Sequence, residues 1–545
     1  MINRLKSMNW ILAVGMIGFY CRQSTSMSIL DSPEQKIQTP CINFHAGRPR
    51  SDETAACLGN VALPVKLLNT DLVLVYNSQG TTVDRFYMSR SRYTASGPRV
   101  AVKWGFLSDA TLFPPHVGIN TQNATLVLGD GTEISFSIDS TSGNYLPDDP
   151  RMENSLLSFD GTQWVQTLSN GSQRVFGYQD TRGVFHLTAY KNVAGRVVLS
   201  FSRGNLGKIL SVSGLYGFKG AAISYETGQV TIGNNTLVLD NKQRLTSINF
   251  PAPLQASFEY DDVGPYLTRY TDLMGRVTRV QYNSIGLVSK VTDPLGFETN
   301  WNYTSVSVSI NTASDTVLQS FSDGKISSIS SGEGLIQDLQ ISRDTAGRAT
   351  QINQLGLITK FEYALSGRFS FLPTKVTTAD GLIMEIKYND QFWNRPVKEI
   401  NVSGQRGVVK STFEYASPFQ LTKRTVGNSV YVYQYNSLNQ VTSVTLNGQE
   451  LASFSYDSAG NLTSKSNPIF GTSFGSYNLQ GLPGSISQGG DTMSLIYDSL
   501  GRPTSMSSSE ERRSLTYGTF GNIETDQVTY SSGGTRTTTR TVNFR

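Results

Sequence analysis

The sequence predicts an all-β fold built as an array of β-hairpins. The chain of 545 residues contains 50 Gly, 25 Tyr and 26 Phe, and only 16% of its residues are charged. Turn signatures recur at short intervals, and the segments between them alternate apolar and polar residues, as half-buried strands do. No long run rich in Ala, Leu, Glu and Lys interrupts this pattern, so we expect no helical domain.

The clearest repeat unit lies between residues 272 and 303. Tyr282 is followed by an Asn-Ser-Ile-Gly turn that ends at Gly286, and a second turn has Asp293 first, Pro294 second and Gly296 fourth. Both match type I turns. Residues 297–303 then alternate strictly and end at Tyr303, with Phe297, Thr299 and Trp301 on the same predicted face. One unit is therefore strand, turn, strand, turn.

The same unit returns further along the chain, roughly every 20 to 25 residues. Residues 357–363 and 382–388 alternate in the same way and end on tyrosine, and Tyr-turn segments occur near residues 260, 435 and 517. Two later copies carry the full signature: Tyr456, Asp457 and Gly460 in one, and Tyr497, Asp498, Gly501 and Arg502 in the other. Residues 304–341 and 464–495 are rich in Ser and Gly and predict degenerate repeats.

Composition and spacing divide the chain into four parts. Residues 1–26 resemble a secretory signal, with Arg4 and Lys6 before an apolar run too short to span a bilayer. Residues 27–60 read as a linker or plug, residues 61–240 as a β-rich introductory region, and residues 241–545 as the repeat region. Cys21 raises lipid attachment as an alternative fate of the N-terminus. Cys41 and Cys57 either form a disulfide or remain free thiols.

These segments together resemble Rhs and other YD-repeat proteins. DLVLVYNSQG, KWGF and ATLVLGDGTEISFSI resemble the family's introductory region, and DPLG, YDSAGNL and YDSLGRP resemble the YD repeat. The resemblance covers about residues 61 to 530 and implies a β-ribbon that spirals into a shell or partial cage, with tyrosines along its wall. We find no segment that resembles the family's C-terminal cap or toxin.

One short segment of the sequence fits a catalytic motif. Gly471-Thr-Ser473-Phe-Gly475 fits the GxSxG signature of a nucleophile elbow, but that chemistry needs a histidine base after the serine and a strand-to-helix turn. The histidines are His45, His116 and His186, all upstream. Neither CxxC nor HExxH occurs, so we expect no cofactor, no bound metal and no enzymatic activity.

The expected role is that of an exported structural protein. The formal net charge of +4 includes basic residues within the signal-like segment, so we expect no nucleic-acid partner, and we expect no membrane span after signal cleavage.

Alternating strands offer tyrosine and tryptophan faces for a carbohydrate or a cell-surface protein. The alternative, implied by the resemblance, is a shell component that encloses a cargo toxin, completed by a second shell-forming chain. An open array also has free strand edges, so residues 529–544 are expected to self-associate unless the N-terminal segment covers an edge.

Overall fold

The computed structural model describes a set of short N-terminal strands and most residues from Ala110 to Thr539. The described ranges are 65–68, 71–74, 86–89, 93–94, 97–98, 103–106, 110–115, 123–128, 133–148, 154–215, 221–232, 235–241, 245–249, 255–261, 267–272, 275–284, 288–304, 306–312, 316–322, 325–331, 339–405, 407–479, 481–498, 501–517 and 523–539. The predicted signal, the linker, Cys21, Cys41, Cys57 and Gly286 lie outside these residues.

The described chain is all β, as predicted, apart from two single 3-10 turns, Asn205–Gly207 and Gly367–Phe369. The first strands form three separate two-stranded pairs: β1 (Val65–Leu68) with β2 (Asp71–Leu74), β3 (Phe86–Ser89) with β6 (Lys103–Phe106), and β4 (Tyr93–Thr94) with β5 (Gly97–Pro98). All later strands belong to one continuous antiparallel sheet.

That sheet begins as a small ring of strands. Its members are β7 (Ala110–Phe113), β8 (Ala124–Leu128), β9 (Glu133–Ile138), β10 (Tyr145–Pro147), β11 (Ser155–Phe159), β12 (Trp164–Leu168), β13 (Gln173–Phe176), β14 (Tyr178–Gln179) and β15 (Phe185–His186). β13 and β14 are one strand interrupted at Gly177, and β15 pairs with β14 on one side and β7 on the other. The ring therefore closes on itself, and its inward side chains, such as Leu112, Leu126 and Phe136, are completely buried.

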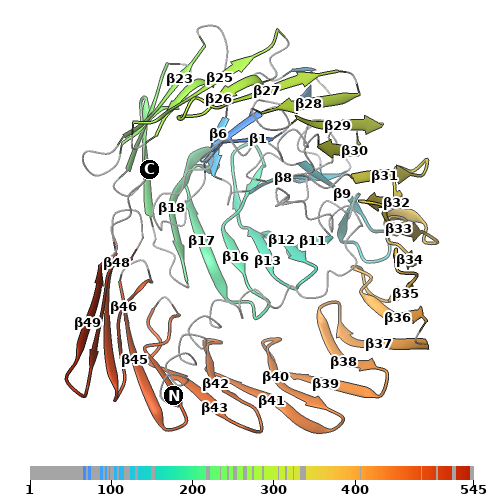
Figure 1. Ribbon diagram of the computed structural model, residues 1–545, viewed down its shortest axis with the longest axis vertical. Helices are drawn as coiled ribbons and strands as arrows, with labels where there is room; N and C mark the ends of the chain where they lie inside the picture. Colours follow the sequence, from blue (N-terminus) through green and yellow to red (C-terminus); the bar gives the residue numbers. More distant parts are fainter. Residues whose placement is uncertain are drawn as a thin grey trace.

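A long ribbon leaves the ring where the sheet branches. β16 (Ala189–Lys191) continues the line of β15, but it pairs with β13 and with β17 (Val197–Arg203) instead of β7. From β17 onward each strand pairs with the next, through β18 (Ile209–Gly214), to β49 (Thr535–Thr539). In Figure 1 this ribbon runs from the ring at the centre over the top, down the right side, along the bottom and up to the left.

The first half of the ribbon, called here the packed half, comprises β16 to β33. After β18 its strands are β19 (Ala221–Glu226), β20 (Gln229–Ile232), β21 (Asn235–Leu239), β22 (Leu245–Asn249), β23 (Gln255–Tyr260), β24 (Leu267–Thr271), β25 (Val277–Tyr282), β26 (Val288–Thr292), β27 (Glu298–Tyr303), β28 (Ser307–Asn311), β29 (Thr316–Ser322), β30 (Lys325–Ser331), β31 (Leu339–Arg343), β32 (Ala349–Gln354) and β33 (Leu357–Glu362). One hydrophobic core cluster runs from the ring through this half as far as Ile352. The described residues of the segment 304–341, which is predicted to be Ser-rich and degenerate, include the strands β28, β29 and β30.

The second half, called here the open wall, comprises β34 to β49. Its strands before β49 are β34 (Lys375–Thr377), β35 (Ile383–Tyr388), β36 (Val397–Gly404), β37 (Gly407–Ser417), β38 (Gln420–Val426), β39 (Ser429–Tyr435), β40 (Val441–Leu446), β41 (Gln449–Tyr456), β42 (Leu462–Ser466), β43 (Gly471–Gly475), β44 (Ser485–Gln488), β45 (Asp491–Tyr497), β46 (Pro503–Ser507), β47 (Glu511–Tyr517) and β48 (Ile523–Tyr530). Most of its side chains are only half-buried. A small second cluster contains Ile486, Met493 and Leu495.

Turns alternate between the two edges of the ribbon. We call the edge whose turns follow the repeat tyrosines the tyrosine edge, and the other the far edge. Apolar side chains at the far edge are exposed: Leu295 is 79% and Ile469 88% exposed. The predicted strand 297–303 shows the gradient, because Phe297 beside the far edge is 60% exposed and Trp301 only 2%. Thus the predicted alternation of this strand is present, but its first aromatic residue lies in solvent.

Candidate functional site

Tyrosine hydroxyls connect successive repeats along the ribbon. Each donates a hydrogen bond to a backbone carbonyl of the preceding repeat, and we call these contacts the tyrosine stitches. The donor and acceptor pairs are Tyr260 to Leu245, Tyr282 to Leu267, Tyr363 to Ala349, Tyr388 to Pro373, Tyr415 to Val397, Tyr435 to Leu421, Tyr456 to Val441, Tyr477 to Leu462, Tyr497 to Pro483 and Tyr517 to Pro503.

A β-bulge places most of these acceptors, whereas the strand pairings beside Pro373 and Pro483 contain no register shift. The strand register shifts between Gln434 and Tyr435, so that Tyr435 pairs with Val441, and the carbonyl of Val441 accepts the hydroxyl of Tyr456 at 2.9 Å. A bulge leaves a residue outside the regular ladder, which frees a carbonyl for a side-chain donor. From Tyr388 to Tyr456 each stitch tyrosine thus pairs with the residue that receives the next tyrosine, and these stitches form a chain.

Burial affects the chemistry of these hydroxyls. Desolvation raises the pKa of Tyr435 and of Tyr497 to about 12, with the neighbouring Tyr433 adding to the shift at Tyr435. A half-buried tyrosine that donates to a carbonyl must keep its proton, because a phenolate has no proton to donate. The stitch tyrosines are therefore structural donors at neutral pH.

In several repeat turns, one aspartate side chain fixes the turn. In the turn from Asp498 to Arg502, the Asp498 carboxylate accepts the backbone N–H of Arg502 at 2.9 Å and its guanidinium Nε–H at 2.7 Å. The backbone N–H of Gly501 donates to the Asp498 carbonyl at 3.0 Å, with Gly501 at φ +74°. Asp272 with Arg276 and Asp344 with Arg348 repeat this arrangement.

The predicted Asp-Pro-Leu-Gly turn has the same backbone without the arginine. Asp293 accepts the N–H groups of Leu295 and Phe297 at 2.9 and 2.8 Å, and Gly296 has φ +87°. Pro294 occupies the second turn position, where its fixed φ suits a type I turn. The sequence-predicted repeat residues of this unit therefore shape a hairpin, and none of them approaches a reactive group among the described residues.

The second tyrosine of that unit, Tyr303, packs against the main core. Tyr477 forms a stitch to Leu462 within the Ser-rich segment where the sequence predicts degenerate repeats. Leu239 and Arg343 occupy the bulge position of the tyrosine, and their cross-strand partners Leu245 and Ala349 still receive the next stitch. The geometry is thus kept where the sequence signature is lost.

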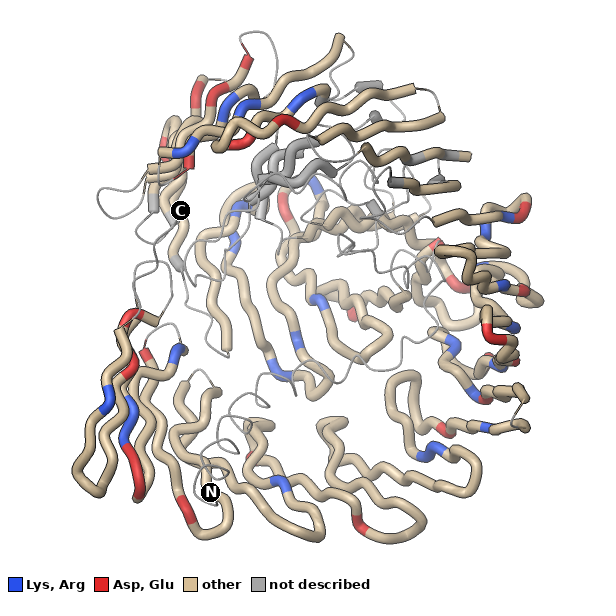
Figure 2. The backbone as a smooth tube through the Cα atoms, in the orientation of Figure 1, with Lys and Arg blue, Asp and Glu red and all other residues tan. Residues whose placement is uncertain are grey.

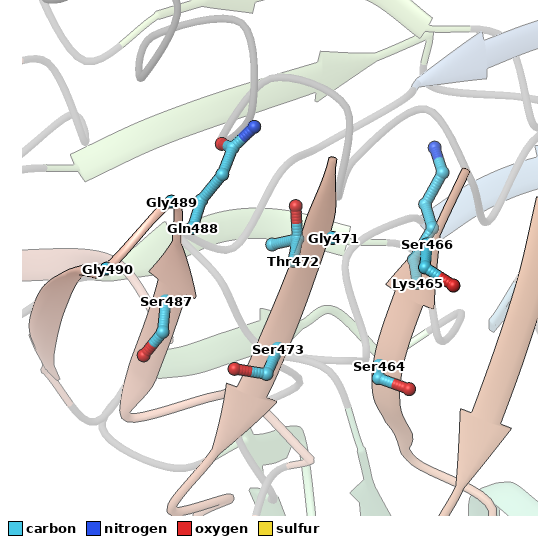
Figure 3. Close-up of a pocket in the computed structure, with 10 residues that line it drawn as sticks. All are labelled: Ser464, Lys465, Ser466, Gly471, Thr472, Ser473, Ser487, Gln488, Gly489 and Gly490. Atoms are coloured by element: carbon cyan, nitrogen blue, oxygen red, sulfur yellow. The ribbon is translucent and has the colours of Figure 1, made fainter. Parts of the chain in front are cut away.

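Ser473 lies in the middle of β43 and not on a strand-to-helix turn. It pairs with Ser464 of β42 and Ser487 of β44, and the three hydroxyls line a shallow depression of about 290 Å³ (Figure 3). Lys465, Thr472 and Gln488 project from the same strands (Figure 3). A hydroxyl-lined depression of this kind suits polar contacts.

A buried polar cluster that no sequence motif marks lies in the ring. Asp180 and His186 face each other across the β14–β15 hairpin, with His186 Nε2 3.2 Å from Asp180 Oδ2. Arg182 donates to the same oxygen at 2.6 Å, and hydrogen bonds from Arg182 and His186 outweigh desolvation and lower the pKa of Asp180. Gly207 packs against the imidazole, because a Cβ there would lie 2.2 Å from His186 Cε1. The cluster fixes the hairpin that closes the ring.

Charge and hydropathy give few other candidate sites. Figure 2 shows basic and acidic residues interspersed along the strands. Among the described residues no cluster of three or more His, Cys, Asp or Glu is arranged for a metal ion. Within the same part of the chain, no helix has the length and hydropathy to cross a membrane.

The fold and its stitches define a structural protein built from β-hairpin repeats. Residues 435–468 match the RHS repeat family, and this range contains the stitches from Tyr435 and Tyr456. The chain thus contains an RHS, or YD, repeat.

Several solved structures are similar to the chain at low identity. A TcdB2-TccC3-TEV crystal structure is 12% identical with a TM-score of 0.39, covering 76% of this chain and 27% of that one. A TcdB2-TccC3 crystal structure is 11% identical with a TM-score of 0.39, covering 84% and 30%. The Photorhabdus luminescens Tc holotoxin pore is 11% identical with a TM-score of 0.40, covering 75% and 26%. The chain thus spans less than a third of these proteins, and no curated protein matches it in sequence.

Proposed function

We propose that this protein is a non-enzymatic wall component, a curved sheet whose repeats are held in register by tyrosine stitches. The observation that carries the proposal is the unbroken series of strand pairings from β16 to β49 around the ring. A sheet one layer thick supplies surface and curvature, and its repeat residues are occupied with turns and stitches. Purified protein should therefore keep its binding or enclosing property when Ser473 is replaced by alanine, and a hydrolytic activity lost in Ser473→Ala would contradict the proposal.

The finer role that we propose is to surround a polypeptide. One face of the open wall carries half-buried aromatic residues, including Tyr431, Tyr433 and Phe454. Such a surface makes weak contacts with many apolar sequences, which suits a cargo without a fixed partner shape. The second shell-forming chain expected from the family resemblance would complete the enclosure.

Protease protection tests this role. The product of a neighbouring gene, co-expressed with this protein, should co-purify with it and resist trypsin until the shell is denatured. Rapid digestion of that product in the presence of the intact, folded protein would contradict enclosure.

A second candidate is carbohydrate or cell-surface binding by the same face. The guanidinium carbon of Arg424 lies 6.0 Å from the ring centroid of Phe413 and 5.9 Å from that of Tyr431, so flat aromatic faces and a hydrogen-bond donor occur side by side. A glycan array or a cell-binding assay with wild type and Tyr431→Ala separates the two roles. Binding that is lost in the variant favours recognition, and no binding by either protein favours enclosure.

We also propose that the protein is exported, on the strength of the signal-like segment 1–26. N-terminal sequencing of protein from the culture medium should begin near residue 27. Retention of the full N-terminus inside the cell would contradict export.

A further inference from the structure

The repeat turns differ in whether they contain their own charge pair. Three turns are complete, because an arginine at the fifth turn position donates from Nε to the carboxylate of the first residue: Asp272 with Arg276 at 2.7 Å, Asp344 with Arg348 at 2.6 Å and Asp498 with Arg502 at 2.7 Å. Charge-assisted hydrogen bonds of this kind are stronger than neutral ones. They provide the reference for two of the incomplete turns, which contact each other.

One incomplete turn has the arginine without the carboxylate. In the β16–β17 turn the first residue is Asn192, whose single side-chain oxygen accepts the backbone N–H of Arg196 at 3.0 Å. An amide has no second oxygen for the guanidinium, whereas an aspartate does. The Arg196 guanidinium is consequently directed away from its own turn.

The other incomplete turn has the carboxylate without the arginine. In the β41–β42 turn Asp457 accepts the backbone N–H of residue 461 at 2.8 Å, as in the complete turns, but residue 461 is asparagine. Asn461 donates its side-chain amide to Asp457 Oδ2 at 2.8 Å and is only 8% exposed. Its amide oxygen remains to accept from elsewhere.

These two turns meet across the fold. Arg196 Nη1 donates to Asn461 Oδ1 at 2.5 Å, although the two residues are 265 positions apart. Burial alone would raise the pKa of Asp457, but the Asn461 hydrogen bonds and the positive charge of Arg196 lower it. Each turn therefore supplies the group that the other lacks, with Asn461 as the bridge.

Neighbouring turns make parallel contacts between the same two regions. The Asn439 amide donates to the carbonyl of Val193 at 3.5 Å, and Asn154 donates to the carbonyl of Asn394 at 3.0 Å. Phe419 packs so closely on the β12–β13 turn that a Cβ at Gly171 would lie 2.9 Å from its ring. All the wall residues named here belong to the tyrosine edge, which faces the ring in Figure 1.

We propose that Arg196, Asn461 and Asp457 form a latch that fastens the tyrosine edge of the open wall to the ring side of the molecule. The residues that differ from the complete turns, Asn192 and Asn461, are the ones that direct the arginine across the gap. The proposal holds whatever the interior contains, so its test is separate from that of cargo enclosure.

Two substitutions release the latch while completing the local turns. Asn192→Asp gives Arg196 a carboxylate in its own turn, and Asn461→Arg gives Asp457 an arginine in its own turn and repels Arg196. Both recreate the arrangement of Asp498 and Arg502, so neither should cost folding. A matched control, Asn478→Asp with Leu482→Arg, completes another turn at the same edge.

Hydrogen exchange of the full chain, with small-angle X-ray scattering, measures the outcome. Both variants should speed amide exchange at residues 436–440 and 457–461 by about tenfold or more, the factor set by loss of one charge-assisted hydrogen bond. They should also increase the radius of gyration, while exchange in β7 to β13 and the control stay at wild-type values. Unchanged exchange and scattering would overturn the proposal, and so would a uniform rise across ring and ribbon.

Discussion

The packed half of the ribbon and the open wall have the same strand pairing but different sources of stability. In the packed half, Val280, Val291, Trp301 and Ile310 are 1–3% exposed and join the core of the ring. In the open wall beyond β36, the buried apolar residues of the described chain are Phe413, Ile486, Met493, Leu495 and Leu515. The wall has a run of stitches from Tyr388 to Tyr517, of the kind that Tyr260 and Tyr282 also make in the packed half. In the open wall, where few apolar side chains are fully buried, the stitches thus recur at nearly every repeat.

The largest expected effect is the loss of a core aromatic residue in the packed half. Trp301→Ala should lower the free energy of unfolding by about 3 to 5 kcal/mol, because a fully buried indole leaves a cavity. Phe297→Ala, in the same hairpin but exposed, should change it by less than about 0.5 kcal/mol. Denaturant titration monitored by fluorescence compares the two, and equal effects would show that the core does not extend to β27.

As the pH is raised, the open wall should lose stability at a lower pH than the ring. The folded pKa values of Tyr415, Tyr435 and Tyr497 are about 12 because of burial, above the ordinary value of 10.0. A raised tyrosine pKa stabilises the fold below pH 10, and this stability is lost as pH rises from 10 to 12. Absorbance of tyrosinate should therefore appear together with faster exchange in β38 to β47. Tyrosines that titrate at pH 10 with no change in the wall would contradict the stitches.

Replacing a turn glycine should lower stability in both halves, because the turn needs a backbone conformation with positive φ. Gly296→Ala places a side chain at φ +87° in open space, so its cost is backbone strain of about 1 to 2 kcal/mol. Leu295→Ala, one residue earlier and 79% exposed, is the control and should be nearly neutral. Thermal unfolding of the two variants measures the difference. A neutral Gly296→Ala would mean that the turn relaxes to another conformation.

A single stitch should have the smallest effect. Tyr435→Phe keeps the ring but removes the donor to Leu421, which should cost about 1 kcal/mol. Tyr433→Phe on the same strand is the matched control, with an expected change of less than about 0.5 kcal/mol. Urea unfolding of both variants decides the matter, and equal losses would assign the stability to the rings and not to the hydroxyl.

The sequence predicts the hairpin array well because its signals are local. A turn is predicted within four residues by Asp293, Pro294 and Gly296. The alternation of apolar and polar residues around Trp301 predicts which face of the strand is buried. Which carbonyls accept the stitches cannot be predicted from local sequence. Val441 receives Tyr456 only because a bulge at Tyr435 shifts the register, and that shift is a property of the pairing between two strands.

The ring and its polar cluster are also invisible in the sequence. Ring closure depends on an interruption at Gly177 and on the change of partner between β15 and β16, both of which are properties of long-range pairing. Asp180 and His186 are six residues apart, which suggests a hairpin but not a buried pair. Arg196 and Asn461 meet only once the ribbon has curved, so their complementarity follows from comparing turns in space.

The most direct test of the account is hydrogen exchange in a variant without three consecutive stitches. Tyr435→Phe, Tyr456→Phe and Tyr477→Phe together should speed exchange in β38 to β43 by about tenfold or more, since each lost hydrogen bond costs about 1 kcal/mol. Exchange in the ring strands β7 to β13 should stay unchanged. Wild-type exchange throughout the wall of this variant would contradict the claim that tyrosine stitches hold the open wall in register.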